Sequence, residues 1–556
     1  MKEPQYNYAW LPFWASVTLV IGMAISSWNS NSSEYQLYDT YDYEYARRNN
    51  FNMLLHIIEE QYVDTVNSKE LTDKAMTNIL KELDPHSAYI PAEDLAGVNE
   101  ELEGSFSGIG IQFNLLNDTI NVVDVISGGP SERCGLMPGD RIITVNDSLF
   151  AGKGITNEKV MKNLRGEKGT VVKLGIKRRG ESELLNFEVE RGDIPLHSID
   201  VAYMIEPNIG YILVSKFGRT TFEEFLVALA RLRNEGAESF IVDLRGNGGG
   251  YMDAAINMVN EFMPFDKLIV YTEGRSVKRE DYRANGQGSF PHMPIVVLVD
   301  EASASSSEIF AGAIQDNDRG TIIGRRSFGK GLVQQPVEFN DGSVVRLTVA
   351  RYHTPSGRCI QKAYEKGHGE DYENEIFMRY QRGEFYVEDS IRQDGPAYKT
   401  KIGRTVYGGG GIRPDIFVPD DSTGVTSYYK EAAYTGLISQ FCFEVVDQNR
   451  DKLNSLTTLE EKIKWMDSQN LLESFARYGQ KRSLPRRNLM LYKSQRLFKR
   501  AIYSGIIYNC SEMNDYLQYL NKDDNAVKRA VEIILEKKTF PQKPEQPLEP
   551  TDSICE

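Results

Sequence analysis

Three serines stand in a row where an apolar strand gives way to a helix. The sequence DEASASSSE, residues 300–308, ends that strand and opens the helix IFAGAIQ. Free N–H groups and the positive dipole end of a helix N-terminus stabilise a developing oxyanion, so a serine at this turn is placed as a nucleophile. Serines at a helix start are also common as N-caps. The run by itself leaves both a capping role and a catalytic role open.

A serine nucleophile requires an adjacent base. No histidine occurs between His292 and His353, whereas Lys330 lies between two glycines among apolar and aromatic residues. A lysine desolvated in such a pocket has a lowered pKa, because burial disfavours its charged form, and it can then accept a proton. The sequence therefore indicates a Ser–Lys pair. A solvated lysine in a glycine turn is the alternative interpretation.

Two glycine-rich segments bear on the same chemistry. DLRGNGGG, residues 243–250, is either a flexible turn or a source of backbone N–H groups. GRRSFGKG, residues 324–331, nearly spells a phosphate-binding P-loop, but Gly331 stands where that motif needs a hydroxyl to hold magnesium. The acidic strand at residues 295–301 also precedes the lysine instead of following it. These departures argue against an ATPase.

The hydrophobic pattern predicts the elements that must position these residues. From Ile209 onward, apolar runs alternate with helical stretches, which predicts an α/β layer with a buried sheet. Between Gly104 and Gly192, short alternating strands separated by Gly and Pro indicate a small β-rich module. From Phe51 to Leu83, three- and four-residue apolar spacing is typical of two amphipathic helices. Helical periodicity returns after Asp420 and continues to about Lys538.

Composition excludes several classes of protein. A chain of 556 residues with 41% apolar residues is long enough for three or four globular domains. Its net charge of −15 argues against a general nucleic-acid binder. The 5 Cys and 6 His form neither CxxC nor HExxH patterns, so we expect no disulfide framework, no metal and no cofactor.

The N-terminal residues predict a membrane anchor. Ala9 to Trp28 form an uncharged run of 20 residues, roughly the length that crosses a bilayer core. A buried core helix and a cleaved signal peptide are the alternatives. We expect an uncleaved anchor, which makes this a single-pass protein of the cytoplasmic membrane with the bulk of the chain on the periplasmic, extracytoplasmic side.

Together, the motifs resemble a known family. The segments SFIVDLRGNGGG, DEASASSSEIFAGAIQDN, GRRSFGKGLVQ, YHTPSGR and GGIRPDI are similar to the C-terminal processing, or tail-specific, proteases over roughly Phe51 to Val418. The resemblance implies a serine endopeptidase with a Ser–Lys dyad. It also implies a multidomain α/β (α+β) fold, in which a protease core with a central sheet and packed helices carries an inserted PDZ domain.

The resemblance assigns roles to individual residues. Ser305 matches the nucleophile, and Lys330, 25 positions later, matches the base. Gln334 matches a glutamine that orients the lysine amine. The N–H of Ser306 is implied as one oxyanion donor, although the family often has Ala at that position. Three adjacent hydroxyls therefore leave the choice of serine open.

The glycine loop is implied as the source of the second oxyanion donor. Gly248 is our first choice, and Gly249 follows it. The β-rich module resembles a PDZ domain, in which backbone N–H groups hold a terminal carboxylate while the peptide adds to a sheet edge. A β-barrel that only packs is the alternative. The predicted peptide-binding loop is Gly108, Ile109, Gly110 and Ile111.

The expected organisation follows from these segments. It comprises a signal anchor (1–33), an N-terminal helical region (34–103), a PDZ domain (104–192), a protease core (193–420) with a surface insertion (361–407), a helical extension (421–538) and a disordered tail (539–556). We expect protein or peptide substrates bound by their C-termini, membrane contact through the N-terminal segment and no nucleic acid, and we leave a homodimer open.

Two other functions remain open from the sequence. The chain could be a catalytically inactive PDZ adaptor that retains a protease fold. It could also be a Ser-His-Asp hydrolase, which would require His86 or His353 near Ser305. We expect His86, in the sequence DPHS, to be a structural turn residue instead.

Overall fold

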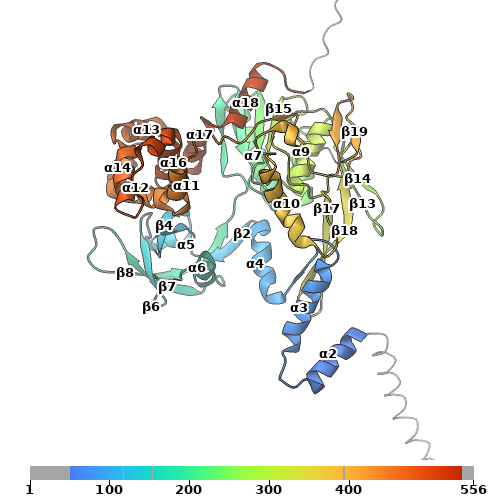
Figure 1. The fold of residues 1–556 in the computed structure, drawn as a ribbon, viewed down its shortest axis with the longest axis horizontal. Coiled ribbons are helices and arrows are strands. Elements are labelled where there is room, and N and C mark those ends of the chain that lie inside the picture. The colour runs from blue at the N-terminus through green and yellow to red at the C-terminus, as the bar shows by residue number, and fades with distance from the viewer. Residues whose placement is uncertain (1–49, 117, 153, 392–394, 541–556) are drawn as a thin grey trace, which may run out of the picture. The chain divides into compact units, whose positions relative to one another are not determined.

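A computed structural model describes residues 50–116, 118–152, 154–391 and 395–540 (Figure 1). The chain divides into two units, residues 1–80 and residues 81–556. In the first unit, the two helices predicted from the spacing of apolar residues are present as α2 (Asn50–Gln61) and α3 (Ser68–Lys81). All other elements named below belong to the second unit.

The predicted membrane localisation is wrong by the structural finding. Among the described residues, no helix is both long and apolar enough to cross a membrane. The longest of them, α12 (Leu437–Asn454), has 18 residues and carries five charged side chains, which a bilayer core disfavours. The run from Ala9 to Trp28, on which the prediction rested, lies outside the described residues. The single-pass placement in the cytoplasmic membrane is therefore withdrawn.

The predicted α/β layer is confirmed as a six-stranded sheet. Its strands β12 and β15 are buried along their whole length, as expected for apolar runs in a sheet covered on both faces. From β11 to β21 the strands are parallel, and β10 pairs antiparallel with β11. In spatial order the strands are β10 (Val201–Glu206), β11 (Ile209–Leu213), β12 (Ser239–Asp243), β15 (Ile295–Val299), β16 (Thr321–Gly324) and β21 (Ile416–Phe417).

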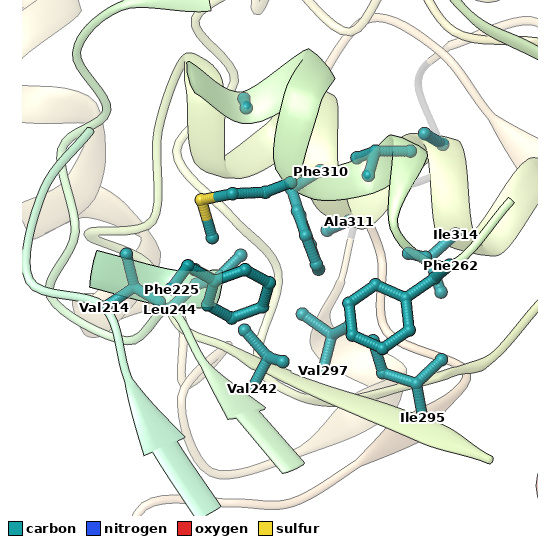
Figure 2. Close-up of a cluster of buried hydrophobic side chains, with 14 of the residues drawn as sticks. Val214, Phe225, Val242, Leu244, Phe262, Ile295, Val297, Phe310, Ala311 and Ile314 are labelled. Atoms are coloured by element: carbon teal, nitrogen blue, oxygen red, sulfur yellow. The ribbon is translucent and has the colours of Figure 1, made fainter. Parts of the chain in front are cut away.

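Helices α7 (Thr221–Asn234), α8 (Met252–Asn260) and α9 (Ser306–Asp316) contribute to one hydrophobic core with this sheet. Phe310 points from α9 toward Val242 and Val297 (Figure 2). All residues of α9 are buried, so the helix that begins next to Ser305 is held firmly against the sheet.

The C-terminal helices form a core of their own, and the last of them also packs against the central sheet. Their last member, α18 (Asn525–Leu535), packs Val527 and Ile533 against Ile241 and Val296 of the central sheet. The other helices form their own core around Phe475 and other apolar residues. They are α11 (Ser427–Tyr434), α12, α13 (Leu459–Ser468), α14 (Leu471–Gln480), α15 (Asn488–Lys493), α16 (Gln495–Tyr508) and α17 (Met513–Asn521).

A second sheet carries the strand that follows Lys330. Strand β17 (Leu332–Glu338) pairs antiparallel with the long strand β18 (Val344–His353), with a bulge between Val333 and Gln334. The same strand β18 also pairs with β1 and β13. The remaining strands are β1 (Ala88–Ile90), β13 (Leu268–Glu273) and β14 (Glu280–Arg283), and helix α4 (Ala92–Glu103) follows β1.

The β-rich module forms a separate antiparallel sheet around a core that includes Ile120, Val122 and Ile142. Strand β3 stands at one end of the strand order, so one of its edges is unpaired within this sheet. The elements are β3 (Ile111–Leu116), β4 (Thr119–Val125), β5 (Arg141–Val145), β6 (Ser148–Leu149), β7 (Val171–Lys177) and β8 (Leu185–Glu190), with α5 (Pro130–Cys134) and α6 (Asn157–Leu164). Strand β2 (Ser105–Gly108) pairs with β9 (Gly192–Pro195).

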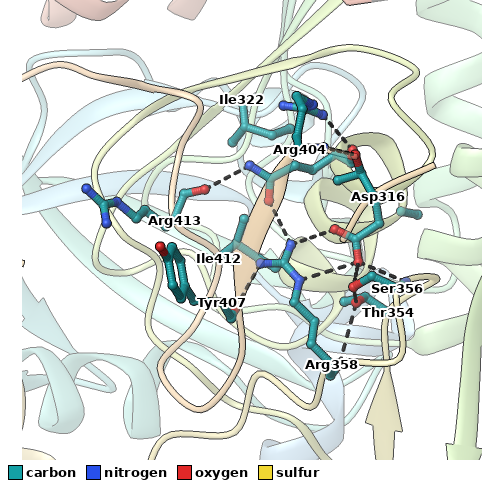
Figure 3. A network of polar contacts seen from close by, with 12 residues as sticks. Asp316, Ile322, Thr354, Ser356, Arg358, Arg404, Tyr407, Ile412 and Arg413 are labelled. Atoms are coloured by element: carbon teal, nitrogen blue, oxygen red, sulfur yellow. Dashed lines mark hydrogen bonds and ion pairs between the residues drawn. The ribbon is translucent and has the colours of Figure 1, made fainter. Parts of the chain in front are cut away.

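The end of α9 is anchored by a buried ion pair, between Asp316 and Arg358 at 2.8 Å, with both side chains fully buried (Figure 3). The guanidinium also donates to Gln315 Oε1 at 2.7 Å and to the Tyr407 carbonyl at 3.0 Å. Ser356 donates to the second carboxylate oxygen at 2.6 Å. This network connects α9 to β20 (Thr405–Tyr407), which pairs with β19 (Ala397–Lys399).

Two boundary predictions need correction. Residues 361–407 are not a surface insertion throughout, because Tyr372 and Arg379 of α10 (Gly369–Gln381) are buried. A short 3-10 helix, η2 (Glu388–Ser390), follows α10. At the start of the predicted disordered tail, Thr539 is buried and the N–H of Phe540 donates to Thr321 Oγ1 at 3.1 Å. The remainder of that tail lies outside the described residues.

Candidate active site

Ser305 occupies a strained turn between β15 and α9. Its φ of +55° and ψ of −114° are unusual for a residue with a side chain and cost about 1–3 kcal/mol. The surrounding structure holds this conformation on both sides. The Ser305 N–H donates to Glu308 Oε2 at 2.9 Å, and the Ser305 carbonyl accepts from the Tyr352 hydroxyl at 3.0 Å. Such a turn between a strand and a helix is the backbone geometry that exposes a nucleophile.

The structure distinguishes among the three adjacent serines. Ser306 donates its hydroxyl hydrogen to the Gly250 carbonyl at 2.9 Å, and Ser307 donates to the Asn247 carbonyl at 2.8 Å. Ser305 and Ser306 both line a cavity, but Ser306 is 1% exposed and Ser307 is 0% exposed, whereas Ser305 is only half-buried. Two of the hydroxyls thus hold the glycine loop against the helix, and the geometry favours Ser305 as the reactive one.

Lys330 lines the same cavity, of about 860 Å³, as Ser305. Burial lowers the pKa of Lys330, and the positive charge of Arg346 acts in the same direction. The carboxylates of Glu308 and Asp84 oppose these two effects. Because the lowering wins, the fraction of neutral amine at a given pH is larger than for a solvated lysine. This is the electrostatic condition that a lysine base needs.

Two buried side chains connect the backbone of Ser305 to that of Lys330. Glu308 Oε2 accepts from the N–H of both residues, at 2.9 and 2.8 Å, and the Tyr352 hydroxyl lies within hydrogen-bond distance of both carbonyls. Glu308 Oε1 accepts from the Ser327 hydroxyl and from the Gly329 N–H, at 2.5 and 2.8 Å. Burial raises the pKa of Glu308 to about 7, although these hydrogen bonds oppose the rise.

Sequence reasoning missed both Glu308 and Tyr352. Glu308 stands three residues after Ser305, which is the spacing of a capping box and could have revealed its bond to the Ser305 N–H. Tyr352 lies 47 positions from Ser305 on β18, and no local pattern connects the two.

The glycine loop approaches the candidate nucleophile closely. A Cβ on Gly249 would lie 2.6 Å from the Ser305 Cβ and 3.0 Å from the Ser306 nitrogen, so only glycine fits there. The Gly249 N–H already donates to Asn247 Oδ1 at 2.8 Å. Gly248 lines the cavity, and a Cβ added to it would meet open space. These contacts favour the N–H of Gly248 over that of Gly249 as an oxyanion donor.

Gln334 also lines the cavity, but its amide hydrogen bonds to His86 and not to the Lys330 amine as predicted. Its Nε2 donates to the His86 carbonyl, in the turn that precedes β1. A bulge redirects the side chains beside it, and the bulge in β17 lies directly before Gln334. Orientation of Lys330 by Gln334 stays a prediction.

No histidine lines the cavity in the part of the chain that the structure describes. His86 Nε2 lies 2.9 Å from the Tyr372 hydroxyl, and burial lowers the pKa of His86 to about 4. His353 stacks on Tyr271 at 4.7 Å between ring centroids. These positions argue against a Ser-His-Asp arrangement around Ser305.

The predicted peptide-binding loop lies at the start of β3. Ile109 and Gly110 are buried, and Gly110 has a φ of +76° that glycine adopts readily. The loop is held by its carbonyls, since the Ile109 carbonyl accepts from the Ser131 N–H at 3.0 Å and the Gly110 carbonyl from the Ile126 N–H at 3.1 Å. The loop leads directly into β3, the strand that has an unpaired edge in this sheet.

Comparison with known proteins bears on the same segments. Residues 208–373 match peptidase family S41, residues 107–190 match a PDZ domain, and residues 428–512 match a family of unknown function. The carboxy-terminal-processing protease of Bartonella bacilliformis is 34% identical over 324 residues, which are 57% of this chain and 73% of that protein. This chain belongs to the carboxy-terminal processing proteases, a family of serine proteases. The resemblance inferred from the sequence motifs is confirmed.

Two Bacillus subtilis proteins are similarly related. Carboxy-terminal processing protease CtpA is 37% identical over 306 residues, 55% of this chain and 65% of that protein. Carboxy-terminal processing protease CtpB is 34% identical over 309 residues, 55% of this chain and 64% of that protein. The matched part of the chain thus spans slightly less than two thirds of either Bacillus protein.

Proposed function

We propose that this protein is a serine endopeptidase that recognises protein C-termini through its PDZ domain and cleaves with Ser305 and Lys330. One observation carries the proposal. Ser305, at a strained turn, and Lys330, with a lowered pKa, line one cavity and are tied together by Glu308 and Tyr352. Family membership supports the same reaction class.

In the proposed mechanism, the neutral amine of Lys330 accepts the proton of the Ser305 hydroxyl as Oγ attacks the substrate carbonyl carbon. The N–H groups of Ser306 and Gly248 stabilise the oxyanion that forms. The Lys330 ammonium then donates its proton to the leaving amine, and an acyl-enzyme remains. Water, deprotonated by Lys330, hydrolyses that ester and restores Ser305.

Substrate recognition uses the PDZ domain. An extended peptide can add to the unpaired edge of β3, with main-chain hydrogen bonds supplying affinity and the loop at Gly108–Ile111 receiving the terminal carboxylate. The match of residues 107–190 to a PDZ domain supports this role.

The test uses the full chain and a casein-type substrate. Ser305→Ala and Lys330→Ala are expected to abolish cleavage while leaving the circular dichroism spectrum unchanged. Matched controls are Ser276→Ala and Lys278→Ala, two exposed residues outside the cavity, which should cleave like the wild type. Substantial cleavage by either active-site variant would refute the proposed roles. Peptide binding without any Ser305-dependent cleavage would instead favour an inactive PDZ adaptor.

A further inference from the structure

The backbone segment that carries Lys330 has no regular secondary structure. Residues 325–331 connect β16 to β17, and their buried polar groups need partners from elsewhere in the fold. Glu308 and Tyr352 supply some of these partners, as described above. Others come from residues 361–379, part of the segment that the sequence predicted to be a surface insertion.

Arg379 of α10 binds two successive carbonyls of the Lys330 segment. Its Nη2 donates to the Arg326 carbonyl at 2.6 Å, and its Nη1 donates to the Ser327 carbonyl at 3.0 Å. The side chain is 0% exposed, and its Nε donates to Glu384 Oε1 at 2.9 Å. A planar guanidinium suits this arrangement, because its donors are fixed relative to one another and can meet two acceptors at once.

Tyr372 lies on the buried face of α10 and contacts the same segment. It is 4% exposed, and its ring meets the Phe328 ring edge-on at 5.8 Å between centroids. The Lys362 ammonium lies 4.0 Å from both ring centroids and donates to the Tyr372 carbonyl at 2.9 Å. A cation between two aromatic faces holds the rings together.

Residues just before α10 complete the contact. The Lys362 N–H donates to the Gly329 carbonyl at 2.9 Å, and Gln361 Oε1 accepts from the Gly331 N–H at 2.8 Å. Gln361 Nε2 in turn donates to the Tyr372 hydroxyl at 3.3 Å. Both peptide neighbours of Lys330 are therefore bound by this part of the chain.

We propose that Tyr372 and Arg379 are positioning residues, through which α10 holds the Lys330 segment in place for proton transfer with Ser305. This inference rests on the proposed function. Arg379 lies outside residues 208–373, the part of the chain that matches peptidase family S41. Part of the helix that positions Lys330 therefore lies beyond the residues that match the family.

The test compares Arg379→Lys and Tyr372→Leu with Met378→Ala, a substitution on the exposed side of the same helix. Lysine keeps the charge but cannot bind both carbonyls and Glu384 together. We expect kcat for casein cleavage to fall about 10- to 100-fold with KM within twofold, since small displacements of a catalytic group have effects of this size. Hydration of a loosened Lys330 should also move the rising limb of the kcat/KM profile to higher pH. Met378→Ala should change neither quantity.

Hydrogen–deuterium exchange of a peptide that covers residues 325–333 gives a readout without catalysis. Faster exchange there in Arg379→Lys, with unchanged exchange in β12 and β15, supports the inference. Folded variants with wild-type kcat, pH profile and exchange overturn it while leaving the proposed function intact. A wild-type chain without Ser305-dependent cleavage overturns the proposed function and this inference with it.

Discussion

Replacement of Glu308 by Gln tests whether one buried carboxylate ties the two halves of the site together. The carboxylate accepts four hydrogen bonds, two at each oxygen, from Ser305, Ser327, Gly329 and Lys330. An amide has a single oxygen, so its NH₂ group replaces one carboxylate oxygen and faces at least one backbone N–H that needs an acceptor. The Ser327 hydroxyl can itself accept from that NH₂ group, whereas the backbone N–H groups cannot. At least one backbone N–H is therefore left without its acceptor.

The number of lost hydrogen bonds sets the expected loss in the free energy of unfolding. Each buried donor left without an acceptor costs about 1–3 kcal/mol, so one or two such donors cost about 1–6 kcal/mol, partly offset because the variant buries no charge. Displacement of the Ser305 and Lys330 backbones should also lower kcat about 10- to 100-fold. Both effects apply at pH 8, since the wild-type carboxyl, with a pKa of about 7, is mostly ionised there.

Urea unfolding and casein cleavage at pH 8 measure the two quantities. Glu373→Gln, on the exposed side of α10, is the matched control and should behave like the wild type. A Glu308→Gln protein with wild-type unfolding midpoint and kcat would refute the reasoning that Glu308 connects nucleophile and base.

Three further predictions concern the base, the core and the PDZ loop. Because burial lowers the pKa of Lys330, kcat/KM of the wild type should rise with pH and level off below the usual lysine value of 10.5, and a flat profile would contradict this. Lys330→Arg, which stays charged, should be inactive at every pH. Arg358→Met leaves Asp316 buried without its ion-pair partner and should destabilise the fold by about 3–5 kcal/mol in urea unfolding. A loss below about 1 kcal/mol would contradict an anchoring role of the ion pair in Figure 3. Gly110→Val requires an unfavourable φ of +76° and places a Cβ 3.0 Å from Ile194, so KM for substrate should rise several-fold with kcat preserved; an unchanged KM would argue against recognition by this loop.

The layered fold could be predicted because strands buried on both faces leave a strong sequence signal. The runs SFIVD and PIVVLVD are apolar throughout, and they became β12 and β15 of the central sheet. Helical periodicity from Asp420 to about Lys538 likewise predicted helices in the region that contains α18. It could not predict that α18 would cover the central sheet, because periodicity shows that a face is apolar without showing what it contacts.

Contacts among polar residues were the part that the sequence concealed. Tyr372 and Arg379 lie in a charged, Gly-containing segment that resembles a surface loop. Part of what stabilises their burial comes from partners far apart in sequence, such as Phe328 and the Ser327 carbonyl. The amide of Gln334 likewise reaches the His86 carbonyl, which no spacing argument around Lys330 could indicate.

The most direct test of Ser305 as nucleophile and Lys330 as its base is labelling with a fluorophosphonate probe, followed by mass spectrometry of the peptides. We expect one adduct, on the Ser305 hydroxyl and not on Ser306 or Ser307, and we expect Lys330→Ala to prevent its formation. An adduct on another serine, or equal labelling of wild type and Lys330→Ala, would contradict the roles of Ser305 as nucleophile and Lys330 as base.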